Sequence, residues 1–183
     1  MALHFSKEEF EKRKSKTLNS MKELNLDALL MFRQESMFWL TGYDTFGYVF
    51  FQTLILDQKG NVILLTRAPD LRQAQNTSNI KDIRIWVDKD NSNPTDDLKI
   101  ILNELDLKGK KIGIEYEAYG MTGRNALKLN KSLDNYCDVE DQSELITKHR
   151  VIKSNEEIVY VKKAAELADK ALNEAWKYTK AGA

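Results

Sequence analysis

The chain has 183 residues, of which 42% are hydrophobic, and this suits one globular domain or one domain with an appendage. Lys+Arg and Asp+Glu both number 28, so the formal net charge is zero and no basic surplus predicts a nucleic-acid partner. No apolar run reaches the roughly 18 residues of a membrane span, and the single cysteine, Cys137, excludes an internal disulfide framework and favours the reducing cytoplasm.

The N-terminal third begins with a helix signal and a strand signal. Ser6 and Glu9 have the spacing of a capping box, so a helix is expected to begin there and to run to about Leu24. Its apolar residues recur on one face, which predicts that it covers one side of a sheet. Residues 27–32, D-A-L-L-M-F, form a short apolar run that is typical of a buried strand.

An aromatic stretch that contains two glycines follows. Polar residues 34–36 can start a helical turn, and Gly42 is expected to end it because glycine tolerates a positive φ. Residues 48–56 are rich in β-branched and aromatic side chains, which predicts a buried strand. Residues 57–60 then predict a turn into a second strand at 62–66, so the two strands form a hairpin.

Four residues around the second glycine are candidate site residues. They combine aromatic rings with a carboxylate on one loop, and they are Tyr43, Asp44, Phe46 and Tyr48. Loops held by a rigid scaffold carry binding and catalytic residues more often than cores do. The alternative is that this stretch is only a hydrophobic hairpin.

Arg67 and Arg72 follow the end of the second expected strand. Two guanidinium groups at a strand end are a candidate carboxylate-binding pair, because the planar fork matches a carboxylate. The alternative is that both are solvated surface arginines.

The middle of the chain alternates between strand and helix signals. Strands are expected at 83–87, 111–114 and 136–139. Helices are expected from Pro94, with Asn93 as its N-cap, and over residues 122–133. The alternation predicts an α/β sandwich, and the hairpin makes its sheet mixed.

The C-terminal section carries a second capping box, Ser154 and Glu157, which predicts the start of a long helix. The helix has an apolar stripe of mostly small residues at Ile158, Val161, Ala165, Ala168, Leu172 and Ala175. The stripe either docks on the preceding domain or belongs to a partner domain outside this chain.

Few residues in this chain suit catalysis. The two histidines, His4 and His149, are far apart in the sequence, and no metal-binding or nucleophile motif occurs. Glu115 and Glu117 face the same way on a strand, and a solvated strand edge is the favoured interpretation. Cys137 lies in an expected strand, where a packed thiol is favoured over a nucleophile. We therefore expect no catalytic residue, no metal ligand and no cofactor in this chain. On its own, the chain is expected to be inactive as an enzyme.

Four motifs occur in a telling order along the chain. They are F-S-x-E-E-F-x-x-R at 5–13, D-A-L-L at 27–30, W-L-T-G-Y at 39–43 and R-V-I-K-S-N-E-E-I at 150–158. Together they resemble the N-terminal domain of the creatinase, prolidase and aminopeptidase P family. Within the family, the stretches at 33–47 and 64–74 look most like the ectoine hydrolase and Xaa-Pro dipeptidase-like branch. The last motif is similar to the family's junction into the catalytic domain.

The resemblance implies a three-layer α/β/α sandwich with a mixed sheet of ribonuclease H-like topology, plus a long C-terminal helix. Residues 1–150 would be the creatinase-type N-terminal domain. Residues 151–183 would be the junction and first helix of a C-terminal catalytic domain outside this chain. Family members that use metals hold divalent ions in that second domain.

The resemblance also implies a homodimer in which the N-terminal domain lends a loop to the neighbouring subunit's active site. In creatinases that loop looks like F-G-R, and the matching positions here are Phe46, Gly47 and Tyr48, so creatine is in doubt as the substrate. The expected function is dimerisation and substrate gating in a C–N hydrolase that acts on a dipeptide-like or cyclic amidine-like small molecule. The alternative is a free-standing interaction module that pairs through the C-terminal helix.

Overall fold

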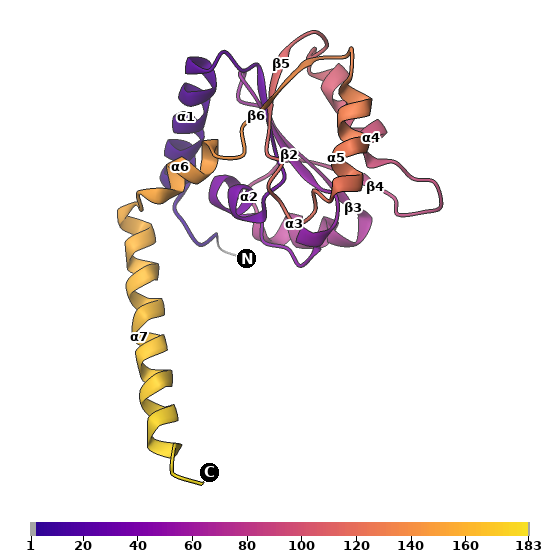
Figure 1. The fold of residues 1–183 in the computed structure, drawn as a ribbon. Helices are drawn as coiled ribbons and strands as arrows, with labels where there is room; N and C mark the ends of the chain where they lie inside the picture. Colours follow the sequence, from indigo (N-terminus) through magenta and orange to yellow (C-terminus); the bar gives the residue numbers. More distant parts are fainter. Residues whose placement is uncertain (1–2, 183) are drawn as a thin grey trace. The chain divides into compact units, whose positions relative to one another are not determined.

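The computed structural model describes residues 3–182, and its centre is a six-stranded sheet with the order β4-β3-β2-β1-β5-β6 (Figure 1). The strands are β1 (Ala28–Met31), β2 (Thr53–Asp57), β3 (Val62–Arg67), β4 (Asp82–Trp86), β5 (Lys111–Ile114) and β6 (Asp138–Asp141). Strand β2 is antiparallel to both of its neighbours, whereas the other pairs are parallel. The predicted mixed sheet is therefore confirmed.

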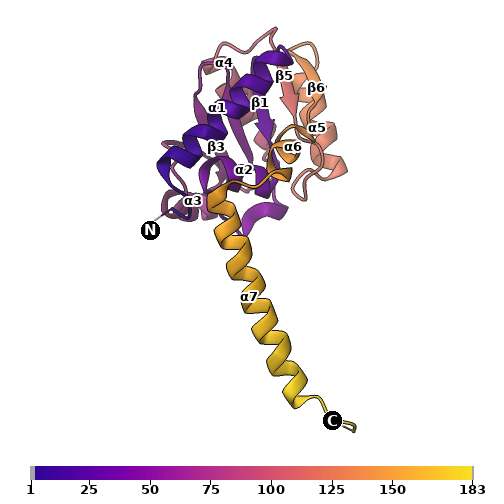
Figure 2. The ribbon, with the colours of Figure 1, turned by 90° about the vertical axis from the view of Figure 1, so that its left-hand side faces the viewer.

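Helices cover both faces of the sheet. In the first part of the chain the helices are α1 (Lys7–Glu23), α2 (Gln34–Thr41), α3 (Leu71–Thr77), α4 (Pro94–Glu104), α5 (Gly123–Leu133) and α6 (Leu145–Val151), with the short 3-10 turns η1 (Gly47–Val49) and η2 (Ala68–Asp70). One further helix, α7 (Asn155–Tyr178), follows them in the chain. Helices α1, α2 and α6 lie on one side of the strands and α4 and α5 on the other (Figure 1). Turning the molecule brings α1 in front of the sheet (Figure 2).

The core has two halves, one on each face of the sheet. Successive side chains of β1 alternate between them: Leu30 packs with α4 and α5, whereas Leu29 and Met31 pack with α1, α2 and α6. Strands β1 and β2 are buried along their whole length because both of their faces are covered. This is the three-layer α/β/α sandwich with ribonuclease H-like topology that the resemblance implies.

Several local signals worked as predicted. The Ser6 hydroxyl accepts a hydrogen bond from the Glu9 backbone N–H at the start of α1. Gly42 ends α2 with φ +80°, and Gly60 turns the hairpin with φ +84°. Pro94 begins α4, but the Asn93 side chain bonds to neighbouring side chains rather than to the helix backbone.

Two predicted strands are placed differently, and one helix was not predicted from the sequence. Residues 48–52 precede β2, because η1 turns the chain there with a hydrogen bond from the Phe50 N–H to the Gly47 carbonyl. Strand β6 begins two residues later than expected, so Cys137 lies just before it. Helix α6 packs Leu145 and Ile146 into the core.

The topology brings several loops to one edge of the sheet. Strands β1, β3 and β5 run in the same direction, so their carboxyl ends, at Met31, Arg67 and Ile114, meet at that edge. Strand β2 is reversed and therefore begins there, at Thr53. The loop that leads into β2 lies at the carboxyl ends of the parallel strands, which is where α/β proteins usually bind ligands.

The chain divides after His149 into two compact units. The second unit contains α7, which begins with the predicted capping box: Ser154 accepts from the Glu157 N–H, and the Glu157 carboxylate accepts from the Ser154 N–H. No residue of α7 is buried, although it carries apolar side chains along its length. No helix within residues 3–182 is long and apolar enough to cross a membrane.

We expect the backbone amides of α7 to exchange with solvent at least about a hundredfold faster than those of β2, because α7 has no buried contacts to protect it. Amide hydrogen exchange of the 183-residue protein measures this directly. Helix α4, which buries Leu98, Ile101 and Leu102, is the matched helical control. Protection of α7 equal to that of α4 would show that something covers the helix.

Candidate functional site

The loop between α2 and β2 is anchored at its base by Tyr43. This side chain is fully buried, and its hydroxyl donates to the Gln52 amide oxygen at 2.8 Å. The Thr66 hydroxyl lies 3.3 Å away from the Tyr43 hydroxyl and donates to the same amide oxygen at 3.1 Å. Burial raises the pKa of Tyr43 above its ordinary value, so the phenol remains a neutral donor. Of the four candidate loop residues, Tyr43 is therefore the one that packs inward.

The first half of the loop is held by α3 and η2. Asp44 is exposed, and its backbone N–H donates to the Thr77 hydroxyl at 3.1 Å. Thr45 is buried, and its hydroxyl accepts from the Gly47 N–H at 2.9 Å. A side chain at Gly47 would place its Cβ 2.5 Å from an Asp70 carboxylate oxygen, so any larger residue here would force the Asp70 side chain to move. The backbone therefore lies directly against Asp70.

Arg67 binds a carboxylate of its own chain. Its Nε lies 3.2 Å from the Asp70 carboxylate, and its guanidinium lies 3.4 Å from the centre of the Phe50 ring. Arg72 lies exposed on α3. Binding of a ligand carboxylate by Arg67 and Arg72 together stays a prediction. The ion pair with Asp70 gives Arg67 a supporting role beneath the loop.

The second half of the loop presents aromatic rings. The Phe46 side chain is 87% exposed, and those of Tyr48 and Phe50 are about 40% exposed. The Tyr48 ring meets the exposed ring of Tyr119 edge-on, with centroids 5.6 Å apart and planes at 74°. Together Phe46, Tyr48, Phe50 and Tyr119 are called the aromatic surface below. Sequence reasoning missed Tyr119, because its partner lies 71 positions earlier in the chain.

Glu115 is fully buried, so the predicted solvated strand edge is wrong for this residue. Its carboxylate accepts the backbone N–H groups of Phe32 and Arg33 at 3.1 and 3.0 Å and the Ser36 hydroxyl at 2.6 Å. Burial disfavours its charged form more than these donors favour it, and raises the pKa of Glu115 from 4.5 to about 7. Glu117, by contrast, is exposed and pairs with Arg33 at 3.0 Å.

Cys137 and His149 are each packed against neighbouring side chains. Burial, with Asp138 nearby, raises the pKa of Cys137 to about 11, so its thiol stays protonated and packed as expected. His149 stacks on Trp39 with ring centroids 6.0 Å apart. Within residues 3–182 there is no group of three or more His, Cys, Asp or Glu side chains that could hold a metal ion. The described residues thus offer no ligand set for a divalent metal.

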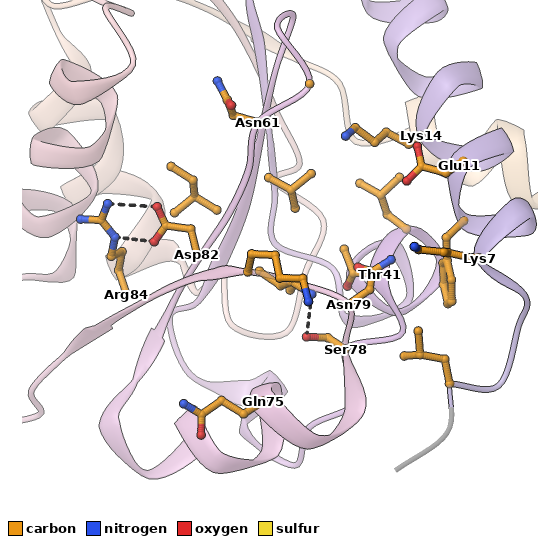
Figure 3. A pocket seen from close by; sticks show the side chains of 18 of the residues that line it. Lys7, Glu11, Lys14, Thr41, Asn61, Gln75, Ser78, Asn79, Asp82 and Arg84 are labelled. Atoms are coloured by element: carbon orange, nitrogen blue, oxygen red, sulfur yellow. Dashed lines mark hydrogen bonds and ion pairs between the residues drawn. The ribbon is translucent and has the colours of Figure 1, made fainter.

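A separate groove of about 960 Å³ lies beside α1, the hairpin turn and the segment before β4 (Figure 3). Lys7 and Lys14 line it from α1, and Asn61 lines it from the hairpin. The Arg84 guanidinium is held by two hydrogen bonds to Asp82. Apolar side chains such as Phe10, Leu40 and Ile80 line the same groove, so its surface is mixed in polarity.

Comparison with known proteins places the chain in a family. Residues 13–152 match the model of the creatinase/prolidase N-terminal domain. The chain belongs to this family. This N-terminal domain is 27% identical over 180 residues to an uncharacterized hydrolase/peptidase of Sinorhizobium fredii, covering 94% of this chain and 46% of the relative. It is 26% identical over 181 residues to the ectoine hydrolase of Halomonas elongata, covering 91% and 43%.

The solved prolidase of Thermococcus sibiricus shares the fold of this N-terminal domain, with a TM-score of 0.76 at 22% identity. The match covers 93% of this chain and 44% of the prolidase chain. The N-terminal domain therefore spans less than half the length of these three relatives. The resemblance to the creatinase, prolidase and aminopeptidase P family is confirmed, and an ectoine hydrolase is among the relatives.

We expect the free energy of unfolding to fall as the pH rises from about 4.5 through 7, because folding raises the pKa of Glu115 and the folded state therefore binds its proton more tightly. A pKa difference of this size corresponds to on the order of 3 kcal/mol. The Glu115→Gln variant lacks this titration, so its stability relative to the wild type should increase as the pH rises towards 7 and above.

Denaturant unfolding of both proteins at pH 5, 6, 7 and 8 measures the effect. Glu117→Gln is the control, because it removes an exposed carboxylate two positions further along the chain. A stability difference between the wild type and Glu115→Gln that does not change with pH would contradict the expectation.

Proposed function

We propose that this chain is a non-catalytic N-terminal domain of a longer cytoplasmic C–N hydrolase. The observation that carries the proposal is α7, which begins with a complete capping box yet buries none of its residues. An amphipathic helix of this length gains most of its stability from packing its apolar face. The lengths of the relatives support a C-terminal catalytic domain as the element that packs there, and any divalent metal would be held in that domain.

The relatives support a small C–N bonded substrate. One is named a hydrolase/peptidase and another an ectoine hydrolase, so a dipeptide-like or cyclic amidine-like molecule is proposed for the whole protein. Tyr48 stands where the creatinase loop has arginine, which argues against creatine. Asp44 is exposed on the same loop and offers a carboxylate to a cationic amine or amidine.

The aromatic surface supports a homodimer in which the loop that carries Tyr43, Asp44, Phe46 and Tyr48 covers the substrate of the neighbouring subunit. Exposed aromatic rings on an anchored loop are suited to shielding a small molecule from water. Phe46 has the ring most open to such a contact. Dimerisation would bring each loop to the partner's catalytic domain. Substrate gating by the loop therefore requires the dimer.

A free-standing interaction module is the second candidate, and the same exposed face of α7 supports it. Such a protein would bind another protein through α7 and would need no hydrolase domain. Reading the coding sequence beyond residue 183 separates the two candidates. A catalytic domain in frame supports the hydrolase, and a stop codon there supports the module.

The 183-residue protein is expected to show no hydrolysis of Xaa-Pro dipeptides or ectoine, with or without added Mn²⁺, because residues 3–182 contain no metal ligand cluster. Product release measured by chromatography at high protein concentration tests this. Turnover that survives repurification and follows the protein through a sizing column would disprove the non-catalytic assignment.

In the longer enzyme, Phe46→Ala and Tyr48→Ala are each expected to raise KM or lower kcat by about tenfold, because each removes a ring that shields the substrate. Phe46 is exposed, so its removal should change the free energy of unfolding by less than about 0.5 kcal/mol. Leu127→Ala is the control, because Leu127 is also an exposed apolar side chain but lies on α5 rather than on the loop. Wild-type kinetics in both loop variants would refute the gating role.

A further inference from the structure

The turn at residues 118–121 lies against the loop through the backbone at Gly120. A Cβ at this position would lie 2.3 Å from the Phe50 carbonyl oxygen and 3.1 Å from the Tyr48 carbonyl oxygen. Both are backbone atoms, which cannot swing aside as the end of a flexible side chain can. Any side chain at Gly120 would therefore separate the turn from the loop.

The turn is itself firmly held at both ends. Before it, the Arg33 guanidinium donates to the Glu117 carbonyl oxygen at 2.9 Å and pairs with the Glu117 carboxylate. Within it, the Met121 N–H donates to the Ala118 carbonyl oxygen at 3.0 Å. After it, the Asn125 side chain donates to the Gly120 carbonyl oxygen at 2.8 Å, which ties the turn to α5. The turn is thus a fixed support for the more exposed loop.

Tyr119, at the tip of the turn, is 76% exposed and is the side chain of the turn that meets the loop's Tyr48 ring edge-on. The two rings also line a cavity of about 360 Å³ together with Arg33, Glu35 and Glu117. An edge-to-face pair favours one orientation of each ring. The contact with Tyr119 therefore favours this orientation of the Tyr48 ring beside the cavity.

We propose that the 118–121 turn is the second half of the substrate-facing surface, and that Tyr119 is a positioning residue that orients Tyr48. The statement that this surface faces a substrate rests on the proposed function. The support that the turn gives to the loop is a property of this chain alone, and it can be tested without a catalytic domain.

The first experiment measures amide hydrogen exchange at Gly47 and Phe50 in the 183-residue protein, since both amides donate within the loop. Gly120→Ala is expected to speed exchange at these amides by about tenfold, and Tyr119→Ala by about threefold, with unchanged exchange in β2. Gly123→Ala is the matched control, because nothing lies within 4 Å of a Cβ there. Tyr119→Phe keeps the ring and should restore wild-type exchange.

Two outcomes of this experiment would overturn the proposal. In the first outcome, the loop amides of Gly120→Ala and Tyr119→Ala exchange no faster than the same amides of the control Gly123→Ala. The other is an equal increase in the loop and in β2, because that would mean general destabilisation rather than loss of a local support. Tyr119 is exposed, so Tyr119→Ala remains informative even if Gly120→Ala fails to fold.

The second experiment uses the longer enzyme and separates this inference from the proposed function. Tyr119→Ala is expected to raise KM about threefold or more with rescue by Tyr119→Phe, as expected of a residue that acts through Tyr48. Suppose that Tyr119→Ala speeds amide exchange in the loop but leaves KM unchanged. That result would show that the turn supports the loop, and it would refute the substrate-facing role.

Discussion

One buried carboxylate joins the segments on which the candidate site depends. Glu115 accepts two backbone N–H groups where β1 ends and a hydroxyl where α2 begins, and it immediately follows β5. It therefore fixes the start of the helix that leads into the aromatic loop and the start of the segment that carries Tyr119. Removing the side chain would leave buried donors without a partner, which is among the costlier changes a core can undergo.

The reversed direction of β2 explains why the aromatic loop lies where it does. An all-parallel sheet would have required a crossover from the end of β1 back to the opposite edge before the next strand. Because β2 runs backwards, α2 and the loop remain at the edge where β1, β3 and β5 end. Arg67 and Glu117 come from the ends of two other strands, so three separate connections support one surface. The family relationship places this arrangement among the prolidase N-terminal domains.

Features specified by neighbouring residues could be predicted from the sequence, and features specified by distant ones could not. The capped start of α7, the glycine that ends α2 and the hairpin all follow from residues close to one another in the chain. The strand predicted at residues 48–56 is wrong only over residues 48–52, because β propensity depends on the packing partner and Phe50 instead meets Arg67. The burial of Glu115 was missed because its donors lie about 80 positions earlier in the chain.

The hydrogen bond from Tyr43 to Gln52 has a thermodynamic consequence for any molecule that meets the loop. It joins the two ends of a ten-residue segment, so the conformational entropy of that segment is lost when the domain folds. A partner that contacts Phe46 and Tyr48 then restricts little beyond two side chains. Preorganisation of this kind lets a small contact area give useful affinity, because little conformational entropy is left to lose when the partner binds.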